Sequence, residues 1–184
     1  MWRNTRRGWG IVSIVLHWAS AVAILGLFVL GWWMTDLGYY DSWYNLAPWW
    51  HRSIGILLLA ATLLRLAWRA FNPSPALPGS RLEKLAAELG HLGLYLLLVV
   101  VLVSGYLIST ADGRGISVFD WFEVPALLSD LPGQATLAGT VHWYLALALI
   151  GLASVHMLAA FKHHIIDRHD VLVRMVNPRI SRKP

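Results

Sequence analysis

Four long apolar segments divide this chain, and they leave it very few possible folds. They cover about residues 11–34, 48–68, 85–110 and 135–164. Each has roughly 20 or more residues, the length needed to cross about 30 Å of hydrocarbon at 1.5 Å per residue. Water-soluble helices of this composition would have no polar face to present to solvent. We therefore predict an all-α fold, an integral membrane four-helix bundle formed by a single domain over residues 1–184.

The composition agrees with a membrane protein and excludes several kinds of cofactor site. The chain is 57% hydrophobic and only 14% charged, with a mean hydropathy of +0.55, whereas about a quarter of a typical soluble domain is charged. It has no cysteine, which excludes disulfides, iron–sulfur clusters, thiolate-ligated haem and covalently attached c-type haem. Any haem must therefore be held without a covalent bond, by histidine or methionine.

The distribution of charge predicts the orientation of the bundle. Basic residues gather in the N-terminal head, in the second connection and in the tail, residues 165–184. The first and third connections are acidic. Lysine and arginine stay on the cytoplasmic side of a membrane, so both termini are expected to be cytoplasmic. The pI of about 9.9 follows from this topology and requires no nucleic-acid partner. The basic residues counted are Arg3, Arg6, Arg7, Arg65, Arg69, Arg81, Lys84, Lys162, Arg168, Arg174, Arg179, Arg182 and Lys183.

The third connection, residues 111–134, is long and contains several glycines and prolines. Its middle, residues 116–128, is aromatic and apolar. We expect this stretch to form a short helix that lies in the membrane interface between spans three and four.

Four histidines lie inside the apolar segments at two matched depths. His17 and His156 each lie about six residues from the cytoplasmic end of their span, which is roughly 9 Å at helical rise. His51 and His142 each lie about one turn from the outer end. His142 and His156 are 14 residues apart, close to four helical turns, so both should project from one face into the bundle.

Two pairs of histidines at equal depths indicate two metal centres stacked across the membrane. Ionisable side chains in hydrocarbon are costly and usually functional, and neutral imidazole is a common metal ligand. Two ligands at each level suit the axial positions of a haem, whereas zinc needs three or four protein ligands. The alternative is that each histidine is a hydrogen-bonded interior residue or an interfacial one, which is plausible for His51 alone. If they are metal ligands, we expect the second ring nitrogen of each to donate to a backbone carbonyl one turn earlier.

The sequence resembles the bacterial cytochrome b561 family from about Thr5 to Met175. The resemblance rests on the order and spacing of Leu16-His17-Trp18, of His51 to Gly55, of Val141-His142-Trp143, and of His156 with Lys162-His163-His164. It implies a four-helix protein of the bacterial inner membrane with two haem b groups. Their ligands would be His17 with His156 on the cytoplasmic side and His51 with His142 on the periplasmic side. Family members exchange electrons with ubiquinone and other quinones, and some are thought to oxidise superoxide.

Several other residues are weaker candidates for cofactor binding. Arg65 follows His51 by 14 residues and could pair with haem propionates at the cytoplasmic level; Arg52 could do so at the outer level. Alternatively, both arginines extend to water. His91 could contact a haem edge or a quinone, or form a hydrogen bond within the bundle. The resemblance places His163 near a quinone headgroup, although solvation is the simpler interpretation.

We therefore expect transmembrane electron transfer through two b haems, with quinone as a reaction partner and superoxide as a possible electron donor. A first alternative is a haem-bearing anchor subunit for a dehydrogenase or hydrogenase, which would have a redox partner protein. A second alternative is a transporter that uses the histidines to move metal ions. The outer loops are net acidic, which counts against an anionic donor such as superoxide.

Overall fold

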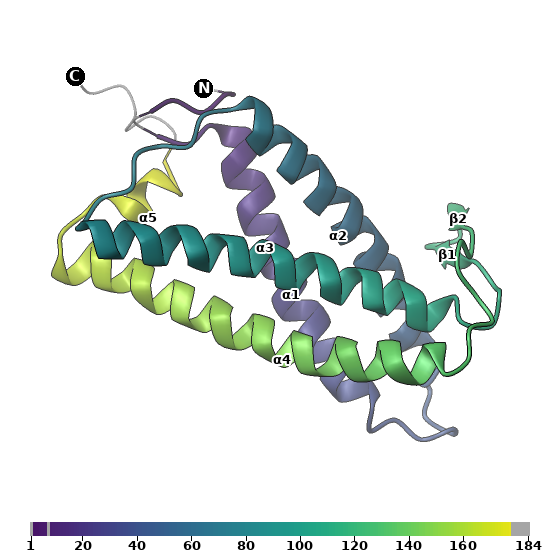
Figure 1. The fold of residues 1–184 in the computed structure, drawn as a ribbon. Coiled ribbons are helices and arrows are strands. Elements are labelled where there is room, and N and C mark those ends of the chain that lie inside the picture. The colour runs from purple at the N-terminus through teal and green to yellow at the C-terminus, as the bar shows by residue number, and fades with distance from the viewer. Residues whose placement is uncertain (1, 7, 178–184) are drawn as a thin grey trace.

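The computed structural model describes residues 2–6 and 8–177, and its dominant elements are four long helices (Figure 1). They are α1 (Ile11–Met34), α2 (Leu46–Phe71), α3 (Arg81–Ser109) and α4 (Gln134–Phe161). A π-helix, η1 (Lys162–Ile166), continues α4, and a short helix, α5 (Val171–Arg174), follows. All four long helices are long and apolar enough to cross a membrane, which confirms the predicted all-α, four-span architecture. Of the basic residues noted above, Arg7, Arg179, Arg182 and Lys183 lie outside the described residues.

The helices extend past the apolar segments because their ends are set by capping as well as by hydropathy. The α3 helix begins at Arg81, four residues before the predicted span. Its N-cap is a reciprocal capping box: the Glu83 amide donates to Ser80 Oγ at 3.3 Å, and the Ser80 amide donates to Glu83 Oε2 at 2.8 Å. Such a box satisfies two of the amides that a helix N-terminus leaves without partners.

The prediction of a short interfacial helix over residues 116–128 is wrong. Strands β1 (Ile116–Val118) and β2 (Phe122–Val124) form an antiparallel hairpin, with Ile116 opposite Val124. Phe119 and Asp120 in its turn have φ angles of 49° and 58°, a left-handed conformation that cannot continue a right-handed helix. The short alternation of buried Ile116, exposed Ser117 and buried Val118 is the strand signal that the aromatic composition concealed.

The hairpin is fastened to the start of α2 by a buried serine. Ser53 is fully buried, and its hydroxyl accepts a hydrogen bond from the Phe119 amide at 3.1 Å. The same hydroxyl lies 3.5 Å from the Ser117 carbonyl oxygen. The hairpin therefore covers one end of the bundle, which we call the hairpin end.

The described N-terminal residues and the described residues after η1 lie at the opposite end, which we call the terminal end. The Ala76 amide donates to the Arg6 carbonyl at 3.2 Å, and Trp18 Nε1 donates to the Met175 carbonyl at 2.8 Å. Arg174 also donates to the Ala76 carbonyl at 3.3 Å. The N-terminal segment, the α2–α3 connection and the segment after η1 thus share one end of the bundle (Figure 1), as an even number of crossings requires.

The four helices meet in a layer of leucines at mid-height. Helix α3 lies along α4, α1 pairs with α2, and α2 also packs on α3. Helices α1 and α4 touch at few places in the described chain. At one of them the rings of Trp32 and Trp143 lie with centroids 5.2 Å apart and planes tilted by 35°. The layer consists of Leu27, Leu58, Leu98, Leu102 and Leu149.

Candidate metal centres

The structure brings the four membrane histidines together as two pairs. At the terminal end, the ring centroids of His17 in α1 and His156 in α4 are 6.4 Å apart, with planes at 73°. At the hairpin end, the centroids of His51 in α2 and His142 in α4 are 6.1 Å apart, with planes at 71°. Helix α4 therefore contributes one ring to each pair, and the leucine layer lies between the two levels: Leu149 is seven residues from each α4 histidine.

The two separations suit a metal ion held between imidazoles. A metal–imidazole nitrogen bond is about 2 Å long, and a ring centre lies about 1.1 Å beyond the nitrogen, so two rings on opposite sides of one ion have centres about 6 Å apart. Both observed pairs have this spacing. No hydrogen bond joins the two rings of either pair in the described chain. The residues present therefore fit a bis-histidine centre at each level.

The same spacing of 14 residues organises all four helices. In each helix, two positions 14 residues apart lie on one face at the two histidine levels, because 14 residues make nearly four turns. The pairs of positions are His17 and Gly31 in α1, His51 and Arg65 in α2, His91 and Gly105 in α3, and His142 and His156 in α4. The terminal level thus contains three histidines and an arginine, and the hairpin level contains two histidines and two glycines.

The two glycines at the hairpin level form seats for the two histidine rings. A Cβ atom at Gly105 would lie 3.0 Å from Cε1 and 3.2 Å from Nδ1 of His142. A Cβ atom at Gly31 would lie 2.9 Å from Cε1 of His51. All three distances are shorter than ordinary van der Waals contacts of about 3.5–4.0 Å. Any larger residue at either glycine would push its imidazole away.

Hydrogen bonding fixes the tautomer of His142. Its Nδ1 lies 2.9 Å from the Val101 carbonyl oxygen, which can only accept, so Nδ1 carries the hydrogen and Nε2 presents its lone pair. The Ser104 hydroxyl lies 3.3 Å from the same Nδ1. The accepting carbonyl belongs to α3 and precedes the seat glycine by one turn. The expectation that it would come one turn earlier in the histidine's own helix is wrong for His142.

The Nδ1 atom of His51 is buried and makes no hydrogen bond to the described residues. Leu27 precedes the seat glycine Gly31 by one turn, the position that Val101 has before Gly105. No hydrogen bond from the described residues fixes the orientation of the His51 ring. A metal ion bound to its Nε2 would fix it.

The terminal pair has two further neighbours. Arg65 Nη2 lies 3.1 Å from His17 Nδ1, and its guanidinium also lies over the Tyr95 ring, 5.3 Å from the centroid. The His91 ring lies 5.3 Å from that of His156. Of the weaker candidates, Arg65 and His91 therefore lie beside the terminal histidine pair, at the same level in the bundle.

Two other candidates lie elsewhere. Arg52 is exposed, and its Nε donates to the Pro48 carbonyl of its own helix at 3.2 Å. His163 lies in η1, where its Nδ1 is 2.7 Å from Asp167 Oδ2 and its ring stacks on His169 with centroids 5.8 Å apart.

Sequence reasoning missed Gly31, Val101 and Ser104. The 14-residue spacing from His17 was a signal that could have identified Gly31.

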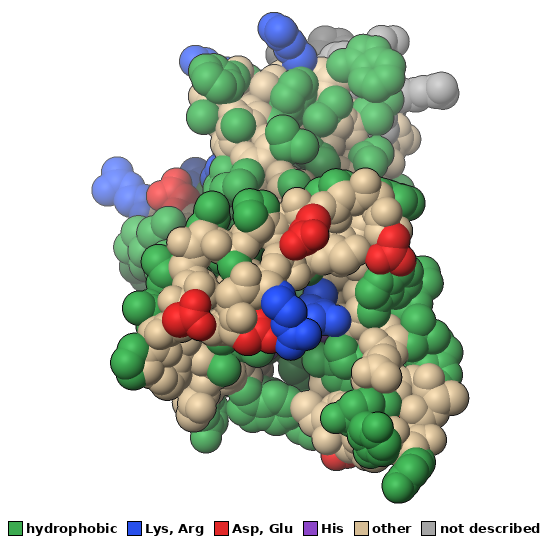
Figure 2. All heavy atoms as spheres, turned by 90° about the vertical axis from the view of Figure 1, so that its right-hand side faces the viewer, with side chains coloured by type: hydrophobic (Ala, Val, Ile, Leu, Met, Phe, Trp, Pro, Cys, Tyr) green, Lys and Arg blue, Asp and Glu red, His purple; other side chains and the backbone are tan. Residues whose placement is uncertain are grey.

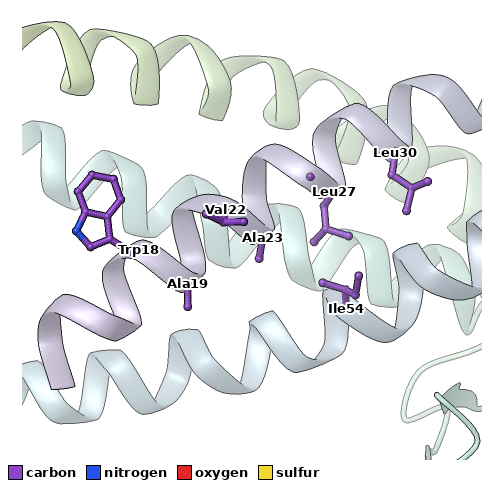
Figure 3. A pocket seen from close by; sticks show the side chains of 8 residues that line it. Trp18, Ala19, Val22, Ala23, Leu27, Leu30 and Ile54 are labelled. Carbon is purple, nitrogen blue, oxygen red and sulfur yellow. The ribbon is translucent and has the colours of Figure 1, made fainter. Parts of the chain in front are cut away.

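An apolar groove of about 680 Å³ runs along α1 between the two histidine levels (Figure 3). Its floor contains the small residues Ala19, Ala23 and Gly26, and Ile54 of α2 closes one side. No histidine lines it. The groove exists because the small side chains of α1 leave space on that face. It is separate from the two histidine pairs.

Similarity to known proteins identifies the family of this chain. The chain matches the family described as prokaryotic cytochrome b561 over residues 8–178. It is 50% identical over 180 residues to the protein named cytochrome b561 homolog 2 from Escherichia coli strain K12, which covers 97% of this chain and 96% of that protein. The chain belongs to the prokaryotic cytochrome b561 family, multi-pass bacterial membrane proteins that bind b-type haem and transfer electrons.

Proposed function

We propose that this protein carries electrons across the bacterial inner membrane through two b haems, one held by each histidine pair, and exchanges them with the quinone pool. The observation that carries the proposal is the presence of two imidazole pairs, with ring centroids 6.4 and 6.1 Å apart, at the two ends of one bundle. A single haem protein would need only one such pair.

The protein's own residues have distinct roles in this proposal. His17 with His156 and His51 with His142 would hold the two irons from both sides. A b haem held by such a pair would supply an iron that gains and loses single electrons. Val101 orients His142, and Gly31 and Gly105 let the rings approach the neighbouring helices. The leucine layer keeps water out of the space between the two levels.

Arg65 fits a role as the partner of a haem carboxylate. Its guanidinium has donors only, so its present contact requires His17 Nδ1 to accept. A histidine that binds iron through Nε2 normally carries a hydrogen on Nδ1, and two donors would then face each other. On haem binding, Arg65 would turn to a propionate, the anionic group that suits a guanidinium at this level.

The charges at the two ends support an orientation with the terminal end in the cytoplasm. Described basic residues at or near that end include Arg3, Arg6, Arg69, Arg81, Lys84 and Arg174. Figure 2 views the hairpin end, where acidic side chains are spread around a small group of basic ones. The single basic residue of the two connections at that end, Arg114, is paired with Asp112 and lowers the pKa of that carboxyl.

This charge distribution also bears on the reaction partners. An acidic periplasmic face repels an anionic donor, so we propose neutral quinone or quinol as the main partner rather than superoxide. Quinone exchange would take place at the terminal end, where the terminal histidine pair is nearest to a surface. Arg81 and Lys84, at the start of α3, are near that surface. Lys84 would supply a proton for quinol formation, whereas Arg81, which does not lose its proton in proteins, would only orient the headgroup.

The test is a dithionite-reduced minus oxidised spectrum of the purified protein, with haem quantified as the pyridine haemochrome. We expect two b haems per chain. The variants His17→Ala and His142→Ala should each retain one haem, with different remaining potentials. Absence of haem in the wild-type protein would overturn the proposal and favour a histidine-using metal transporter. Co-purification with hydrophilic subunits would instead identify an anchor subunit.

A further inference from the structure

A second group of potential metal ligands lies beyond the end of α4, outside the two histidine pairs. His163, Asp167 and His169 each offer one ligand atom, and these atoms all lie within 4.8 Å of one another. The side chains of His163 and Asp167 are 18% and 22% exposed, so the group is partly shielded from water yet reachable from the terminal surface.

An unusual backbone path builds this group. Helix α4 passes into the π-helix η1, which ends with the Asp167 amide donating to the Lys162 carbonyl at 3.2 Å. Arg168 then adopts a left-handed conformation with φ of 55°, which is uncommon for residues other than glycine. This reversal lets the His169 amide donate to the His163 carbonyl at 2.8 Å. Two histidines six residues apart are thereby stacked, with ring planes at 26°.

The polar atoms of the group leave capacity for a ligand. His169 Nδ1 is buried and has no hydrogen-bond partner among the described residues. His163 Nδ1 lies 2.7 Å from Asp167 Oδ2, so the ring and the carboxylate are already side by side, and the proton between them would be released when both groups bind a metal ion. A buried ring nitrogen without a partner is costly, and a metal ion would satisfy it.

The local charges permit a cation. Lys162 lies 2.6 Å from Glu83 Oε1 and 2.7 Å from Asp167 Oδ2, so its single charge is more than balanced by two carboxylates. Its hydrogen bond, with that of His163, holds the pKa of Asp167 below the usual range, and Asp167 is therefore an anion at neutral pH. The neighbouring Arg168 side chain is exposed and can turn towards water.

We propose that His163, Asp167 and His169 form a binding site for a divalent transition-metal ion, distinct from the haem ligands. Two imidazoles and one carboxylate suit ions such as Zn²⁺ and leave a coordination position for water. His163 follows His156 by seven residues, so the site lies about two helical turns, or about 10 Å, beyond the terminal histidine pair. A bound ion would join the π-helix to the segment that follows it.

The experiment measures Zn²⁺ binding by equilibrium dialysis and metal analysis. It uses full-length protein purified in detergent, with its native haem and without a polyhistidine tag, since a tag would bind the metal. We expect one tightly bound Zn²⁺ per chain. Even indirect partners of a metal ligand contribute about 10–100-fold to affinity, so His169→Ala and Asp167→Asn should each weaken binding by about 100-fold or more.

The matched control is His164→Ala, which removes a neighbouring histidine that is not part of the group and should leave Zn²⁺ binding unchanged. An unaltered visible spectrum shows that each variant is folded. The proposal is overturned if the wild-type protein binds no Zn²⁺, if both His169→Ala and Asp167→Asn bind it like wild type, or if His164→Ala loses binding equally. Because haem is read separately, failure here does not affect the proposed electron transfer.

Discussion

The His142 imidazole rests directly on Gly105 of the neighbouring helix, where a Cβ atom would come within 3.0 Å of the ring. Gly105→Ala should therefore displace His142 and remove or distort the haem at the hairpin end. The haem at the terminal end should remain, because its ligands lie about four helical turns away. If the haem is lost, the pyridine haemochrome should fall from about two haems per chain towards one. If it is retained without His142 as a ligand, electron paramagnetic resonance should show a high-spin ferric signal.

Gly31→Ala should have the same effect through His51, since its Cβ atom would lie 2.9 Å from that ring. Gly139→Ala is the matched control: its Cβ atom would meet nothing within 4 Å, although it lies in α4 near the hairpin end. Equal haem loss in Gly139→Ala would show that the effect comes from general helix disruption and not from the seats.

Replacement of Arg65 should change the redox potential of one haem. A positive charge beside the terminal pair stabilises the reduced iron, so Arg65→Leu should lower the potential of that haem. At about 8 Å and an effective dielectric constant of about 20, the charge contributes about 2 kcal/mol, or about 90 mV for one electron. Spectroelectrochemical titration measures the shift. Arg52→Leu, at the other end of α2, should leave the terminal haem unchanged.

Loss of the Ser53 hydroxyl should release the hairpin from the bundle. Ser53→Ala leaves the Phe119 amide without its partner, which costs about 1–3 kcal/mol for a buried group. Amide hydrogen exchange over residues 116–124 should become faster, while the four long helices keep their protection. Ser154→Ala, which removes an exposed hydroxyl bonded within its own helix, should not alter exchange in the hairpin.

Acid should weaken the contact that holds the end of α4. The pKa of Asp167 is lowered from its ordinary value of 3.8 by the hydrogen bond with Lys162 and then by that with His163. A lowered pKa in the folded state contributes stability above pH 3.8, and this is lost as the pH falls through the folded-state pKa. With a chelator present to remove metal ions, the wild-type protein should have a higher melting temperature than Asp167→Asn at pH 7. A difference that persists unchanged at pH 2–3 would contradict this assignment.

The spans and the paired histidines were accessible from the sequence because both depend on regular helix geometry. Apolar length predicts a membrane helix, and depth along parallel axes places His17 at the level of His156 before any contact is known. The helix ends were less accessible. They depend on caps such as Ser80 with Glu83, whose signal is local and independent of hydropathy.

Features that depend on irregular backbone could not be predicted in the same way. The hairpin turns at Phe119 and Asp120, two non-glycine residues with positive φ, and no turn dipeptide marks the position. The grouping of His163 with His169 requires a π-helix and a left-handed Arg168, which sequence periodicity does not reveal. The tautomer of His142 depends on a carbonyl from another helix, so only the tertiary structure identifies it.

Helices α1 and α4 touch at few places, yet each supplies one ligand to the terminal pair. In the proposed holoprotein, this haem would bridge α1 and α4, and α4 is synthesised after α1, α2 and α3. The nascent chain would complete its bundle only once α4 had entered the bilayer and porphyrin was at hand. Membrane proteases would then find an unfinished N-terminal helix in cells starved of haem, and the abundance of the protein would follow the haem supply.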